Sequence, residues 1–185
     1  MRTALLFILL LILMPVCVAI QDLLPEIPPD KERILLLPVL FCFGALALPL
    51  IPALFFALIT AVVQGLLLVK ISSGQTEFGL VMPVVFFLSW ALLLQMASEA
   101  THGMRWEVHA LGSALVTFSW LGGEFLMICF KRGGFPIDTT VLLRMAVPAG
   151  LALLIAPLVY LLLGSLVPYA PEVVLASLRK KGLDS

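Results

Sequence analysis

The chain has 185 residues, of which 62% are hydrophobic, and its formal net charge is zero at pH 7. Soluble domains are about 45–50% apolar, so a mean hydropathy of +1.18 excludes an ordinary soluble domain and indicates a membrane protein with little mass outside the bilayer. The balanced charge gives no sign of a nucleic-acid partner. The three cysteines lie in apolar runs and show neither metal-ligand spacing nor a disulfide framework.

Six apolar segments predict six membrane-spanning helices, because a helix needs about 20 mostly apolar residues to cross a bilayer. In chain order they cover residues 3–20, 34–48, 51–69, 79–97, 107–130 and 140–163. We therefore expect an all-α polytopic membrane protein. Residues 1–185 would form a single integral membrane domain, which ends in a basic C-terminal tail at residues 165–185.

The start of the chain and the division between the second and third segments are each indicated by local sequence features. The first segment has Arg2 as its only basic residue before a nearly full-length apolar run, which favours a retained helix over a signal peptide cleaved near Ala19. The second and third segments are separated only by "PLIP", Pro49 to Pro52. Two prolines three residues apart remove backbone donors and disfavour helix before them, so this stretch predicts a tight hairpin.

Orientation follows from the even number of predicted spans, which places both termini on one side. Basic residues are divided equally between the two sides, but the "RKK" cluster at residues 179–181 favours a cytoplasmic C-terminus. We therefore expect a multi-pass protein of the bacterial inner membrane with both termini in the cytoplasm.

Three polar residues are predicted to lie at similar depth within the spans. Glu124 and Arg144 lie in neighbouring antiparallel segments, and Gln64 lies near the same end of the third segment. A charge near the bilayer centre costs about 2.5–3.5 kcal/mol on insertion scales, so it needs a partner, a wet cavity or a function. We predict that Arg144 neutralises Glu124 and that Gln64 bonds to the pair. Such a pair would either only fix helix packing or have a transport or catalytic role, and simple snorkelling to the interface is the remaining alternative.

Small residues indicate where helices can approach closely. Gly122 and Gly123 precede Glu124, and two pairs of small residues are spaced four apart. Such spacing allows close contacts between membrane helices, either within the bundle or with a partner. The two pairs are Ala110 with Ala114, and Ala152 with Ala156.

No catalytic or cofactor-binding constellation is visible. Ser113 in "LGSAL" has one flanking glycine but lacks the second glycine of a nucleophile elbow. His109, near the start of the fifth segment, is expected to be an interface residue. The sequence shows no phosphate loop and no metal-binding histidine spacing. We therefore predict a protein that is not an enzyme and that needs no cofactor or metal.

Two stretches give the chain a resemblance to the MreD family of rod-shape-determining membrane proteins. Residues 55–85, "FFALITAVVQGLLLVKISSGQTEFGLVMPVV", resemble the family's glycine-containing third span, short turn and Leu-Gly restart. Residues 144–166, "RMAVPAGLALLIAPLVYLLLGSL", are similar to its final span. The chain departs from the family after Gly65, where "LLLVK" replaces a stretch that often carries an aspartate. Any role of that acid is therefore in doubt here.

The resemblance implies a non-enzymatic scaffold of lateral cell-wall synthesis that works with MreC, MreB, RodA and its transpeptidase. It also implies a six-helix bundle similar to the substrate-binding subunits of energy-coupling-factor vitamin transporters. A partner's transmembrane helix, such as that of MreC, would pack on a face of small residues, where dispersion and interhelical hydrogen bonds drive association.

The same bundle suggests a rival function, a substrate-binding membrane subunit of a vitamin or small-molecule transporter. A ligand site should bring several aromatic and polar groups together around an open pocket. The three tryptophans are dispersed along the chain, and both tyrosines lie at the end opposite Glu124. This distribution favours the scaffold.

Overall fold

The computed structural model describes residues 2–24, 34–71, 81–100, 106–134 and 138–166, and within these ranges α-helices are the only regular secondary structure. The all-α prediction is therefore confirmed for the described part, whereas nearly all of the predicted basic tail lies outside it. Six helices follow one another in the chain: α1 Arg2–Leu23, α2 Leu37–Ala47, α3 Leu50–Ile71, α4 Val81–Ala100, α5 Trp106–Arg132 and α6 Thr139–Leu166.

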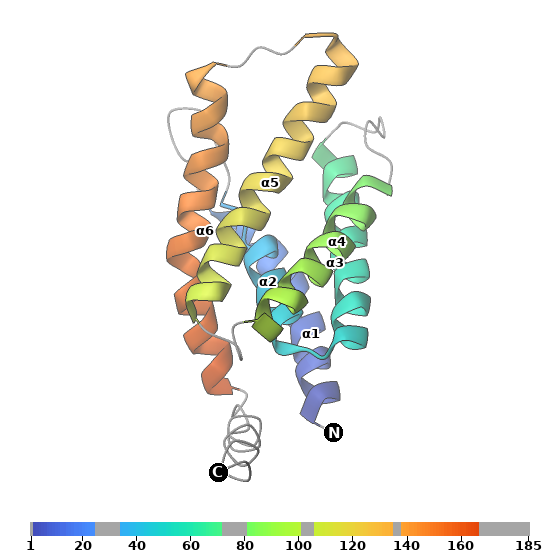
Figure 1. The fold of residues 1–185 in the computed structure, drawn as a ribbon, viewed down its shortest axis with the longest axis vertical. Helices are drawn as coiled ribbons and strands as arrows, with labels where there is room; N and C mark the ends of the chain where they lie inside the picture. Colours follow the sequence, from blue (N-terminus) through green and yellow to red (C-terminus); the bar gives the residue numbers. More distant parts are fainter. Residues whose placement is uncertain (1, 25–33, 72–80, 101–105, 135–137, 167–185) are drawn as a thin grey trace.

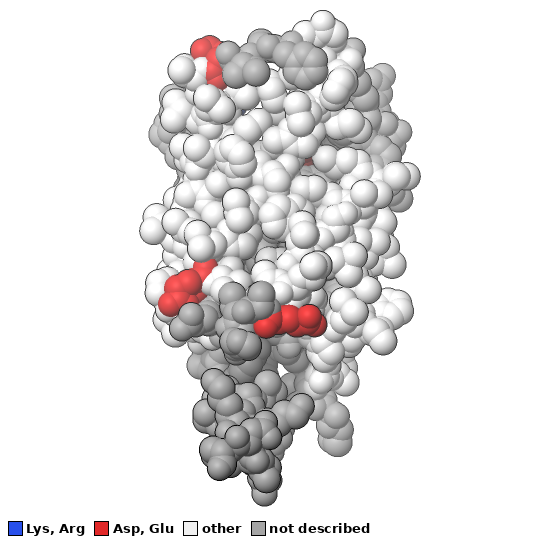
Figure 2. All heavy atoms as spheres, viewed as in Figure 1, with Lys and Arg blue, Asp and Glu red and all other residues white. Residues whose placement is uncertain are grey.

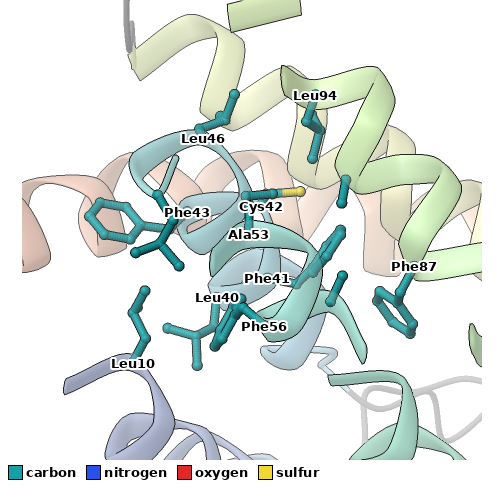
Figure 3. Close-up of a cluster of buried hydrophobic side chains, with 14 of the residues drawn as sticks. Leu10, Leu40, Phe41, Cys42, Phe43, Leu46, Ala53, Phe56, Phe87 and Leu94 are labelled. Carbon is teal, nitrogen blue, oxygen red and sulfur yellow. The ribbon is translucent and has the colours of Figure 1, made fainter. Parts of the chain in front are cut away.

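The helices alternate in direction, so α1 begins and α6 ends at the same end of the bundle (Figure 1). α5 packs along α6, and α3 packs along α4. The short α2 lies in the middle and touches each of the other five described helices. Figure 3 shows its side chains, among them Phe41 and Phe43, surrounded by residues of α1, α3 and α4. The sequence of α2 is apolar on every face, which suits a helix that is buried all round.

α2 is too short to be the full second span that the sequence predicts. It has 11 residues, or about 16 Å at 1.5 Å per residue, against a hydrocarbon core of about 30 Å. All of its residues from Leu37 to Leu46 are buried. A helix therefore does occupy the predicted segment 34–48, but it is short and buried at the centre of the bundle, because an apolar run of this length fits a buried core helix as well as a span.

Among the described helices, four are long and apolar enough to cross a membrane. They contain the stretches Thr3–Leu23, Val81–Glu99, Trp106–Phe130 and Thr139–Gly164. α3 contributes a shorter apolar stretch, Leu50–Leu66, although the helix itself continues to Ile71. The structure thus has the composition and helix lengths of a helical membrane protein.

The outer surface is apolar over most of its height. Large hydrophobic side chains such as Leu154 on α6 and Leu5 on α1 are more than 60% exposed. In Figure 2, acidic side chains lie near the two ends of the bundle and the wall between them is almost entirely white. Glu99, Glu107 and Asp138 are all exposed. Such a surface would be unstable in water but suits contact with lipid.

Gly44 explains how α3 can lie so close to α2. A Cβ atom at this position would overlap the aromatic ring of Phe56. Both residues are buried in the main apolar core, so the ring of α3 fills the space that a side chain of α2 would otherwise occupy.

Candidate functional site

The break between α2 and α3 leaves two carbonyl groups without their usual backbone donors. In a continuous helix, Ala45 O would accept from residue 49 and Leu48 O from residue 52, but both of those residues are prolines and have no N–H. Gln95 of α4 supplies the missing donors. Its Nε2 donates to Ala45 O at 2.5 Å and to Leu48 O at 2.7 Å.

A second side-chain amide satisfies the other end of α2. The backbone N–H of Leu36, the residue just before the helix, donates to Oε1 of Gln21 at 3.1 Å. Gln21 belongs to α1 and is buried. Irregular backbone at membrane depth is tolerated only where protein or water satisfies its polar groups. The two glutamines do this for α2 from opposite ends.

His109 ties α5 to the same central helix. Its Nε2 lies 3.3 Å from Val39 O of α2, and because a carbonyl can only accept, Nε2 must carry the proton in this contact. The imidazole is completely buried, with the ring of Phe43 edge-on at 5.8 Å. The expectation of an interface residue is therefore wrong. The position of His109 in its segment indicates only how deep it lies along α5. Whether it is buried depends on which face of α5 carries it, and that face points into the bundle.

The inward face of α5 carries a polar stripe that sequence reasoning missed. Its five members are spaced by four, four, three and four residues, which places them within an arc of about 80° at 100° per residue. This heptad-like spacing, visible in the sequence, predicts that the five residues lie on one face of the helix. We call this set the α5 stripe: His109, Ser113, Thr117, Trp120 and Glu124.

Glu124 lies at the end of the α5 stripe, partly buried, and forms a hydrogen bond with the Trp120 side chain one turn earlier. An indole N–H can only donate, so the carboxylate oxygen accepts. Glu124 is thus held from within its own helix. Arg144 lies exposed on α6 and is not the group that makes this hydrogen bond. The predicted Glu124–Arg144 pairing stays a prediction.

Gln64 does not join that site. It is buried on α3, and its Oε1 has no hydrogen-bond partner among the described residues. In the described part of the chain, α3 packs against α1, α2 and α4 but not against α5 or α6. The predicted contact of Gln64 with Glu124 and Arg144 is therefore absent. Two residues at the same depth in a membrane are in contact only if their helices are also neighbours, and α3 and α5 are not.

The predicted small residues lie in two environments. Ala110 of α5 is buried with Ala152 and Ala156 of α6, and together with Val39 they form one cluster, while Ala114 is half-buried. These alanines therefore serve contacts inside the bundle.

The glycines before Glu124 are less crowded. A Cβ at Gly123 would lie 3.0 Å from Cε of Met82, whereas one at Gly122 would meet nothing within 4 Å. Only Gly123 therefore serves a close approach, that of α4 to α5, and it does so against a flexible side chain.

The buried polar atoms that remain do not form a catalytic pair. Ser113 Oγ and His109 Nδ1 have no hydrogen-bond partner among the described residues, so these neighbours on the α5 stripe do not bond to each other. The Cys42 thiol beside Ser113 is only a weak donor. Among the described residues, no group of three His, Cys, Asp or Glu side chains could hold a metal ion. Among the described residues, these polar side chains lie where helices pack against one another.

Comparison of the chain with protein-family models, with curated proteins and with solved structures finds no match in any of the three.

Proposed function

We propose that the protein is a non-enzymatic scaffold of the bacterial cell-wall elongation machinery, a member of the MreD family that binds the transmembrane helices of partners such as MreC. The observation that carries this proposal is a pair of small residues on the outer face of α6. Ala146 and Gly150 are spaced four apart and both are exposed, and a Cβ at Gly150 would meet no atom within 4 Å.

This pair differs from the alanines that the sequence singled out. Ala110, Ala152 and Ala156 are buried against one another inside the bundle and are not available to a partner. Ala146 and Gly150 lie among exposed apolar side chains, including Val147 and Leu154. Small residues four apart let a second helix approach closely in lipid, where dispersion drives association. A partner helix that packs on α6 would therefore centre on Gly150.

The sequence resemblance to the MreD family also points to α6 as the helix that a partner would bind. The stretch from Arg144 to Leu166, which resembles the final MreD span, forms most of α6. In the proposal, MreC supplies the packing helix, and RodA, its transpeptidase and MreB join the same assembly. A bundle similar to energy-coupling-factor substrate-binding subunits, placed in the inner membrane with both termini cytoplasmic, belongs to the proposal as well.

The test is a crosslinking pull-down of the tagged protein from native membranes, read by mass spectrometry. Recovery of MreC or RodA with the unmodified chain, and its loss with Gly150→Leu, would support the scaffold. Ala19→Leu is the matched control, because it places the same leucine side chain at an exposed position of another helix, α1. If wall-synthesis proteins are absent, or if both variants recover them equally, the proposal fails.

The second candidate function is a substrate-binding subunit of a vitamin or small-molecule transporter. The broken, half-length α2 favours it, since discontinuous helices near the midplane often line substrate sites. However, Gln21, Gln95 and His109 are engaged with the backbone of α2 or the residue before it. Recovery of a transporter ATPase pair with its coupling subunit, and of no wall-synthesis protein, would favour this function over the scaffold.

A further inference from the structure

The four candidate spans of the described chain have two different apolar lengths. The apolar stretches of α1 and α4 have 21 and 19 residues, whereas those of α5 and α6 have 25 and 26. At 1.5 Å per residue these lengths are about 28–32 Å for the first pair and about 38–39 Å for the second. The first pair matches a hydrocarbon core of about 30 Å, and the second pair exceeds it by about 8–9 Å.

The extra apolar length is concentrated on one side and at one end of the bundle. α5 and α6 pack along each other, and within the described chain α1 contacts neither of them. α1 begins at the end of the bundle where α6 finishes, whereas at the opposite end the hairpin of α5 and α6 extends beyond the end of α3 and the start of α4 (Figure 1). The long helices therefore project past the short ones at the end opposite the start of α1.

The projecting part of the hairpin has a surface that suits acyl chains. Large apolar side chains are exposed on both helices near its tip, among them Leu126 and Phe130 on α5 and Leu142 and Leu143 on α6. Asp138, immediately before α6, is exposed and marks the polar boundary of this face. The apolar surface therefore continues to the tip of the hairpin and does not stop at the level where α4 begins.

Tilting the molecule does not match both pairs of helices to a flat bilayer. A tilt of about 40° would reduce the apolar length of α6 from about 39 Å to about 30 Å across the membrane. The same tilt would reduce that of α4 from about 28 Å to about 22 Å, because both helices turn with the bundle. A flat bilayer therefore matches one side of the protein and mismatches the other.

We propose that the protein holds the bilayer thicker along α5 and α6 than along α1 and α4. Lipid around the hairpin would extend by about 8–9 Å beyond the ordinary core, at the end of the bundle opposite the start of α1. Bilayers thicken locally around long apolar helices, and this cover keeps the exposed leucines and phenylalanine of the hairpin out of water. The inference does not depend on the proposed scaffold role, because it concerns the surrounding lipid and not a partner helix.

The experiment places the full chain in vesicles of dimyristoleoyl-, dioleoyl- or dierucoyl-phosphatidylcholine, which form bilayers of increasing thickness. Leu142→Cys puts a thiol near the start of α6, and Val81→Cys puts one at the first residue of α4; both positions are exposed. Reaction with a water-soluble maleimide is located by mass spectrometry and compared with the reaction of the unfolded chain. In the dioleoyl lipid we expect Val81→Cys to react and Leu142→Cys to lose its reaction, although α6 begins farther out than α4 (Figure 1).

The thin and thick bilayers supply the controls. Both thiols should react in the dimyristoleoyl lipid, and neither should react in the dierucoyl lipid. Equal reaction of the two thiols in the dioleoyl lipid, or faster reaction of Leu142→Cys, would show a flat bilayer and overturn the proposal. Protection of Leu142→Cys in all three lipids would mean that protein covers the tip, and would overturn it too. If Leu142→Cys does not fold, Phe130→Cys makes the same test from α5, where its position is exposed.

Discussion

Replacing Gln95 with methionine should destabilise the bundle far more than its half-buried position suggests. The change keeps a similar volume but removes the Nε2 donor from Ala45 O and Leu48 O. Because Pro49 and Pro52 supply no N–H, neither carbonyl can recover its usual helical hydrogen bond.

The magnitude follows from two estimates. Hydrogen bonds in a membrane protein average about 0.6 kcal/mol, with a maximum of about 1.7, so two of them give about 1–3 kcal/mol. A buried acceptor left unsatisfied costs about 1–3 kcal/mol on its own. We therefore expect Gln95→Met to lower the free energy of unfolding by about 2–3 kcal/mol. Gln95→Glu should cost at least as much, because an ionised carboxylate cannot donate to the two carbonyls.

The assay is reversible unfolding in mixed micelles, with the free energy of unfolding compared between variants. Ser89→Ala is the matched control on the same helix. Ser89 is exposed and its hydroxyl bonds only to Val85 O one turn earlier, so its removal should change stability by about 0.5 kcal/mol or less. If Gln95→Met costs no more than Ser89→Ala, the glutamine does not hold the break between α2 and α3.

The remaining predictions concern other points of the bundle. His109→Leu should lower the free energy of unfolding by about 1–2 kcal/mol and His109→Gln by less, because glutamine can still donate to the α2 carbonyl. Gly44→Ala should cost about 1–3 kcal/mol through overlap with an aromatic ring, whereas Gly122→Ala, which meets nothing within 4 Å, should be neutral or slightly stabilising; equal effects in thermal unfolding would contradict this. A double-mutant cycle of Glu124→Gln and Arg144→Ala measures the predicted pair, where additivity within about 0.5 kcal/mol would exclude it and a larger coupling would establish it.

Three polar residues from other helices, Gln21, Gln95 and His109, share the role of bonding to the backbone of α2 or the residues beside it. Glutamines are costly within an apolar bundle unless they are bonded, and Gln21 and Gln95 both bond to backbone groups that flank or end α2. The two prolines and the glutamine of α4 are therefore best understood together, although more than 40 residues separate them in the chain. We expect exchange of α2 amides with solvent to accelerate when either glutamine is replaced.

The sequence by itself determined the elements. Long apolar runs favour helices in lipid, because a helix satisfies its backbone hydrogen bonds within one segment. The six predicted segments correspond to the six described helices with end shifts of three residues or fewer. The "PLIP" stretch marked the break between α2 and α3, because proline removes a donor wherever it stands.

Only the tertiary structure shows which helices pack against one another and which side chains come into contact. The length of the apolar run at 34–48 could not reveal that α2 is central and short, since burial by protein and burial by lipid demand the same side chains. Likewise, depth placed Gln64 near Glu124 in one dimension, yet helix order keeps α3 away from α5. Gln95 became the donor for the α2 carbonyls because packing brought α4 beside the break, and long-range contact of that kind is not encoded in any local pattern.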